Sequence, residues 1–217
     1  MSGDRTHRLI RALGADLEPV RPVPRLRYVL AALLGVWLLA SLLGLALRGV
    51  RPDLGTGPFG SDGLALAALG LLGLGGLTAS AALSLPGRDR LAGAGQKVAF
   101  LGAALALGCA TWLLLGAPTA DLAVGATAHL ACLAVACAVG LAPALAVVSF
   151  ARRAAPFRPV ALALLAAAGA TALGTIAAHT SCPYGGPEHL ALGHIAAPFA
   201  GVLLMTLPLV AALRRNA

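Results

Sequence analysis

Six long apolar stretches, separated by short polar segments, make up most of the chain. Their approximate limits are residues 29–47, 64–85, 97–115, 124–148, 159–180 and 190–213. A helix needs about 20 predominantly apolar residues to cross the hydrocarbon core of a bilayer, and no Asp, Glu or Arg lies within these stretches. The pattern therefore predicts an all-α polytopic membrane protein whose six transmembrane helices occupy residues 29–213.

Composition supports this fold class. Hydrophobic residues make up 59% of the 217 residues and charged residues 11%, whereas soluble domains carry about 25% charged residues. Small residues recur within the apolar stretches, as in "GLLGLGGLTAS" and at every fourth position in Ala166, Ala170, Gly174 and Ala178. Such spacing lets helices approach closely in lipid, so it predicts packing faces rather than chemistry.

The basic residues alternate along the chain between the two ends of the predicted helices. All 16 Lys and Arg residues except Arg48 and Arg51 belong to the N-terminal segment, the second–third and fourth–fifth connections, or the C-terminal tail. Lys and Arg are concentrated on the cytoplasmic side of membrane proteins. We therefore expect both termini, residues 1–28 and 214–217, to be cytoplasmic. The net charge of +8 is then a topology signal, and direct nucleic-acid binding is not expected.

The N-terminal segment, residues 1–28, combines a helical pattern with a proline-rich linker. Its apolar residues recur at helical spacing, namely Leu9, Ile10, Leu13 and Leu17. They predict an amphipathic helix of about 13 residues, which ends at Glu18 because the residue before a proline avoids the helical region. Two interpretations remain open from the pattern alone: a basic helix lying on the membrane surface, or a docking helix for a soluble protein.

Thiols and imidazoles gather at the opposite, outer side of the predicted helices. The stretch "HTSCPYGGPEH", residues 179–189, joins the fifth helix to the sixth, and His129 and Cys132 lie in the outer half of the fourth. Cys and His together suit zinc, copper and similar metals. The candidate ligands are Cys132, Cys182, His189 and His194. No resident cofactor is required, and a heavy-metal or zinc ion would bind transiently at this outer face.

A disulfide is the alternative use of the outer cysteines, because that compartment is oxidising. Cys132 and Cys182 are the preferred pair, provided that the connection dips into the helix bundle, whereas Cys109 and Cys137 are expected to fill apolar space. Pro198 lacks the N–H that would bond the carbonyl of His194, so we expect an irregular helix there and a polar pocket beside it.

The chain resembles the NrsF family, the negative regulators of sigma factor F. The resemblance rests on the order of short motifs along nearly the whole chain: "LIRALGADLEPVRP", "RPDL", "PGR", "HLAC", "RRAAPFRP" and "CPYGGPEHLALGH". It implies a six-span anti-sigma factor of the bacterial inner membrane. It also implies that Cys132 and Cys182 respond to stress from heavy metals or oxidation. Family members typically carry Trp before the final His of this last motif, where this chain has Gly193.

The resemblance favours the docking interpretation of the N-terminal segment. It implies that the cytoplasmic partner is an extracytoplasmic-function sigma factor. The lipid bilayer surrounds the transmembrane helices. The apolar stripe would bury against the sigma factor, and acidic residues would set its register; the candidate residues are Leu9, Ile10, Leu13, Asp16, Leu17 and Glu18. Binding of metal or an oxidant at the outer cysteines would shift the fourth to sixth helices and release the sigma factor, without an enzymatic step.

Two other classes of protein fit the apolar pattern. One is a small transporter or channel for a metal ion, although no predicted helix carries the buried acidic residue that usually marks an ion pathway. The other is a membrane thiol or haem redox protein, with His129 and His194 as conceivable axial ligands.

Overall fold

The fold is a bundle of long α-helices. The computed structural model describes residues 3–15, 24–51, 61–116, 125–154 and 156–214. Six helical regions are long and apolar enough to cross a membrane, and no strand occurs among the described residues, which confirms the predicted fold class. The first five are α2 (Leu26–Arg48), α3 (Ser61–Leu83), α4 (Asp89–Gly116), α5 (Ala126–Ala151) and α6 (Pro159–Thr180).

The sixth region is not a uniform α-helix. It begins with the single turn α7 (Pro187–His189), continues as the π-helix η2 (Leu190–Ile195) and ends as α8 (Ala197–Arg214). The predicted irregularity near Pro198 is therefore present, and it takes the form of a π-helical segment on the N-terminal side of the proline.

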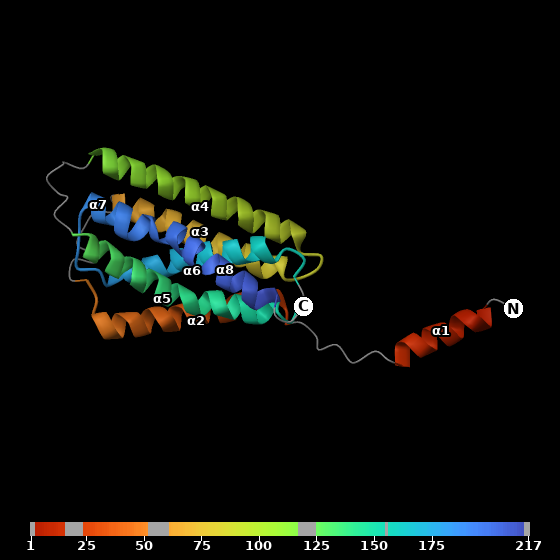
Figure 1. Ribbon diagram of the computed structural model, residues 1–217. Coiled ribbons are helices and arrows are strands. Elements are labelled where there is room, and N and C mark those ends of the chain that lie inside the picture. Colours follow the sequence, from red (N-terminus) through yellow and green to blue (C-terminus); the bar gives the residue numbers. More distant parts are fainter. Residues whose placement is uncertain (1–2, 16–23, 52–60, 117–124, 155, 215–217) are drawn as a thin grey trace.

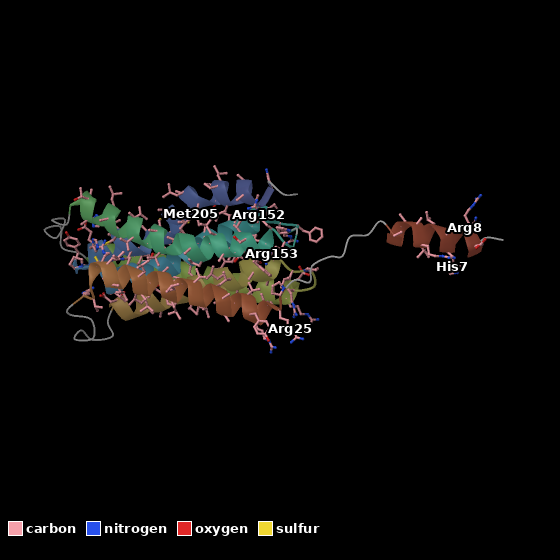
Figure 2. The ribbon with its side chains drawn as sticks, turned by 90° about the horizontal axis from the view of Figure 1, so that it is seen from below. His7, Arg8, Arg25, Arg152, Arg153 and Met205 are labelled. Carbon is pink, nitrogen blue, oxygen red and sulfur yellow. The ribbon has the colours of Figure 1, made fainter. Side chains whose placement is uncertain are left out.

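The two ends of the bundle differ in what they carry. Figure 1 shows α7 at one end, and the start of α2 and the end of α8 at the other, which is the end that faces α1 (Gly3–Ala15). Arg25, Arg152 and Arg153 lie at the end that faces α1 (Figure 2). Three of the basic residues that the sequence assigned to one side of the membrane thus lie together at one end of the folded bundle.

Small residues allow α3, α5 and α6 to pack almost backbone to backbone. A methyl group added at Gly140 of α5 would lie 2.7 Å from the carbonyl oxygen of Ala170 in α6, and one at Gly76 of α3 would lie 2.8 Å from that of Leu165. Ala166, Ala170 and Ala178 are buried on α6, as the fourfold spacing predicted. Van der Waals packing at small residues is the main cohesion available between helices in lipid, so α6 forms the centre of the bundle.

Helix α1 stands apart from the bundle in Figure 1. Its 13 residues match the predicted length, and an ion pair between Arg8 and Asp4, 3.3 Å apart, spans one turn. Leu9, Ile10 and Leu13 are 60%, 60% and 62% exposed. The candidate residues Asp16, Leu17 and Glu18 lie outside the described residues. The helix therefore presents an apolar surface that the bundle does not cover.

Candidate metal centre

Four side chains capable of holding a metal ion meet at the end of the bundle that carries α7. Cys132 comes from α5, Cys182 from the connection after α6, His189 from α7 and His194 from η2. Their ligand atoms all lie within 4.8 Å of one another. These are the four residues that the sequence singled out, and we refer to them as the Cys/His cluster.

The two thiols form the centre of the cluster. The Sγ atoms of Cys132 and Cys182 are 3.1 Å apart, and Cys182 Sγ lies 3.2 Å from Nε2 of His189. Both cysteines are free thiols in this structure. The preferred cysteine pair is thus in contact, and two sulfur and two nitrogen donors are the set that suits zinc and softer metals.

The expected position at the outer face needs a correction, because the Cys/His cluster is buried. The exposed fractions of Cys132, Cys182, His189 and His194 are 2%, 0%, 1% and 1%. The chain becomes exposed only after Cys182, at residues 183–186, whereas the N–H of Cys182 still donates to the carbonyl of His179 at 3.3 Å and keeps this residue against the last turn of α6. A metal ion held here would be surrounded by protein on every side.

The π-helix explains how the rings of His189 and His194 come to lie 5.1 Å apart. Residues five apart on an α-helix point about 140° away from each other. In a π-helix, hydrogen bonds join residues five apart and bring them closer to the same face of the helix; the N–H of Ala196 accordingly donates to the carbonyl of Ala191 at 3.0 Å. The π-helical segment therefore brings His189 and His194 close together, although an α-helix with the same spacing would direct them apart.

Gly193 makes room for the His189 ring. A Cβ atom at this position would lie 2.9 Å from Cε1 and 3.2 Å from Nε2 of His189, closer than unbonded atoms approach. Glycine at position 193 thus leaves the space that the His189 ring occupies, and a larger residue there would require the ring to shift.

Two further histidines border the cluster. The ring of His129 stacks on that of His189 with centroids 5.0 Å apart, and the ring of His179 meets that of His194 edge-on at 5.1 Å. Tyr184 contacts His189 at 5.5 Å. Helices α5 and α6 thereby extend the cluster into a continuous group of imidazoles.

Several imidazole nitrogens in this group are buried without a hydrogen-bond partner. They are His129 Nε2, His179 Nδ1, His189 Nδ1 and both ring nitrogens of His194. A buried unsatisfied polar atom costs about 1–3 kcal/mol, and such atoms are uncommon in folded proteins. Coordination of a metal ion would satisfy His194 directly, so the residues present fit a metal.

The environment of Cys182 favours the thiolate, which is the metal-binding form of cysteine. The hydrogen bond with Cys132 lowers the pKa of the Cys182 thiol, and an interaction with His194 acts in the same direction, although burial opposes both. A ligand that is already deprotonated binds a metal ion without first losing a proton.

The remaining candidates lie elsewhere. Cys137 packs against the main hydrophobic core and Cys109 against a smaller one, consistent with their expected role as apolar filling. Glu188 lies in the first turn of α7, where an acidic residue is favourable. Sequence reasoning missed Asp62, whose Oδ2 lies 3.7 Å from Nε2 of His179; the available signal was an acidic residue in the first turn of the second predicted transmembrane helix.

The fold and the cluster together define a class of protein: a multi-pass α-helical membrane protein with a buried thiol–imidazole cluster at one end of its bundle. The chain belongs to the NrsF family, described as negative regulator of sigma F, which it matches over residues 13–214. Its partner is accordingly a sigma factor, and the family is one of regulators rather than enzymes. No curated protein and no solved structure matches the chain.

Proposed function

We propose that this protein is an anti-sigma factor of the bacterial inner membrane. It holds an extracytoplasmic-function sigma factor at its cytoplasmic N-terminal segment and releases it when the Cys/His cluster binds a zinc or heavy-metal ion. The observation that carries the proposal is the convergence of two thiols and two imidazoles within 4.8 Å at the end of the bundle opposite the one that faces α1.

The proposed orientation places both termini in the cytoplasm. It is supported by Arg25, Arg152 and Arg153 at the end of the bundle that faces α1 (Figure 2), because basic residues are retained on the cytoplasmic side. The Cys/His cluster then lies toward the outer face, where it meets metal ions before they enter the cell.

The proposed sigma-binding element is the helix α1 and the residues that follow it. Its support is the exposed stripe of Leu9, Ile10 and Leu13, because burying one such side chain contributes about 1.5–3 kcal/mol. Asp16, Leu17 and Glu18 extend this element in sequence, the leucine adding to the stripe and the acidic residues fixing register. A bound sigma factor is thereby kept from RNA polymerase.

Helix α2 connects the two ends of the molecule, because it is the helix to which the N-terminal segment is joined. Two hydrogen bonds tie α2 and the residues directly after it to α6: Trp37 Nε1–H donates to the carbonyl of Leu173 at 3.0 Å, and the N–H of Arg51, three residues beyond the end of α2, donates to the carbonyl of Thr180 at 2.9 Å. Thr180 precedes Cys182 by two residues. Movement of Cys182 toward a metal ion therefore pulls on the end of α6 and, through it, on α2.

The energy required is modest. A tenfold change in sigma-factor affinity corresponds to about 1.4 kcal/mol, and a tetrahedral metal site supplies about 10 kcal/mol or more in small zinc-binding peptides. A small part of the metal-binding energy is sufficient to shift the position of α2.

Oxidation is a second inducing signal that the cluster supports. The two Sγ atoms are 3.1 Å apart, so an oxidant that removes two electrons, with loss of the two thiol protons, joins them as a disulfide. The bond requires the sulfur atoms to approach to about 2.05 Å. Disulfide formation therefore draws Cys182 toward Cys132 and also moves the connection after α6 relative to α5.

The test is sigma-dependent transcription in cells that carry Cys132→Ser, Cys182→Ser or the control Cys137→Ser. Cadmium should induce transcription in cells with the unmodified protein and with Cys137→Ser, which is on the same helix as Cys132 but outside the cluster. The two cluster variants should lose the response. Undiminished induction in both would reject the sensor role.

A further inference from the structure

The burial of the Cys/His cluster raises the question of how an ion reaches it. All four ligands are at most 2% exposed, whereas the carboxylate side chain of Asp62, in the first turn of α3, is 48% exposed. Its Oδ2 lies 3.7 Å from Nε2 of His179, whose side chain is 6% exposed. The pair formed by Asp62 and His179 therefore lies between the exposed surface and the buried Cys/His cluster.

The separation within the pair matches two ligands of one metal ion. A charge-assisted hydrogen bond between imidazole and carboxylate would be about 2.7–2.9 Å long, so 3.7 Å is too long for one. Two ligand atoms bound tetrahedrally to one ion at about 2.0–2.2 Å are about 3.4 Å apart. A small closure of the side chains is sufficient for both to hold the same ion.

The pair also continues into the cluster. The ring of His179 lies edge-on against the ring of His194 with centroids 5.1 Å apart, and His194 is in turn 5.1 Å from His189. The other nitrogen of His179 and both nitrogens of His194 are buried without hydrogen-bond partners. The route from Asp62 to the thiols is thus bordered by imidazole rings with nitrogens available as metal ligands.

We propose that Asp62 and His179 form a second, outer binding site for a divalent soft or borderline metal ion, and that this site delivers the ion through His194 to the buried Cys/His cluster. The proposal rests on the proposed function, since it takes the cluster as the destination. The oxygen and nitrogen donors of the outer site bind more weakly than thiolates, so the ion moves inward.

The test is the rate of cadmium binding by the purified full-length protein in lipid nanodiscs, followed in a stopped-flow instrument by cadmium–thiolate absorbance in the ultraviolet. Asp62→Asn and His179→Gln should slow association by about tenfold or more, since a carboxylate at the mouth of a site raises the on-rate for cations. The final absorbance should equal that of the unmodified protein. Asp62→Glu, which keeps the carboxylate, should retain a faster rate than Asp62→Asn.

The matched control is Asp89→Asn, because Asp89 is likewise an exposed acidic residue in the first turn of a helix, α4, but follows the end of α3 that is remote from Asp62. It should bind cadmium at the original rate. An original rate in Asp62→Asn, with full final absorbance, would overturn the delivery site and leave the cluster intact. Absence of thiolate absorbance in the unmodified protein would instead reject the cluster as a metal site, and the delivery site with it. Asp62 is half exposed, so its variants remain informative should His179→Gln fail to fold.

Discussion

Cys182 lies 3.1 Å from Cys132 although 50 residues separate them in the sequence. One thiol is on α5 and the other is in the connection that follows α6, so the contact joins two helices that are otherwise held by apolar packing. A change of chemistry at this contact alters the relation between α5 and α6 directly.

Replacing His194 by leucine should separate metal binding from stability. Neither ring nitrogen of His194 has a hydrogen-bond partner, so the apolar side chain removes an unsatisfied group and should leave the metal-free protein as stable as before, or more so by about 1 kcal/mol. Cadmium affinity should fall by tenfold or more, since a ligand is lost. Thermal unfolding and cadmium titration in detergent measure the two quantities, and an unchanged affinity would remove His194 from the ligand set.

Replacing Gly193 by alanine should weaken metal binding without touching a ligand. The added methyl group displaces the His189 ring, which lies 2.9 Å from the Cβ position, and misplacement of a ligand typically costs about 10–100-fold in affinity. Gly35→Ala on α2 is the control, because an added methyl group there meets no atom within 4 Å. Equal cadmium affinities for the two variants would contradict this role of Gly193.

Replacing Gly174 by alanine should destabilise the bundle. Its added methyl group would overlap the carbonyl of Ala136 on α5, and overpacking of this kind costs about 1–3 kcal/mol. Gly108→Ala on α4, where nothing lies within 4 Å of the new atom, should have little effect. The comparison is made by thermal unfolding in detergent, and equal melting temperatures would refute the close contact between α5 and α6.

Replacing Trp37 by phenylalanine should weaken transmission while leaving metal binding intact. The variant loses the hydrogen bond to the carbonyl of Leu173, which is worth about 1 kcal/mol, or roughly a fivefold change in the coupling between α6 and α2. Trp112→Phe is the control, since that side chain is 77% exposed. Sigma-factor release at saturating cadmium is the measurement. Full release in Trp37→Phe would show that α2 receives the signal by another contact.

Truncating Leu13 to alanine should weaken sigma-factor binding by about tenfold or more, because the lost apolar burial is worth about 1.5–3 kcal/mol. His7→Ala, on the same exposed helix, serves as the control. Binding of a purified sigma factor to the full-length protein in nanodiscs measures the effect. Equal affinities would argue that α1 lies on the membrane surface instead.

The membrane fold was predictable because the thickness of the bilayer fixes the length of each apolar run. This relation does not depend on how the loops are arranged or on what they contact. The choice of Cys132, Cys182, His189 and His194 was also accessible, since alternating basic charge assigns each of them to the same side. The burial of these four side chains could not be predicted from the sequence. It depends on how the chain turns at Cys182, where the main-chain N–H donates to the carbonyl of His179.

The facing of His189 and His194 could not be read from their spacing, because an α-helix would direct them apart and only the π-helical segment aligns them. Asp62 was missed for a related reason. An acidic residue in the first turn of a helix is common for electrostatic reasons alone, so its sequence context gives no sign of a histidine partner brought by α6.

The hydrogen bond between Arg51 and Thr180 is made by main-chain atoms on both sides. Any residue other than proline at position 51 can donate it, and any residue at position 180 can accept it. The attachment of the segment after α2 to the thiol-bearing connection therefore tolerates side-chain substitution at both positions.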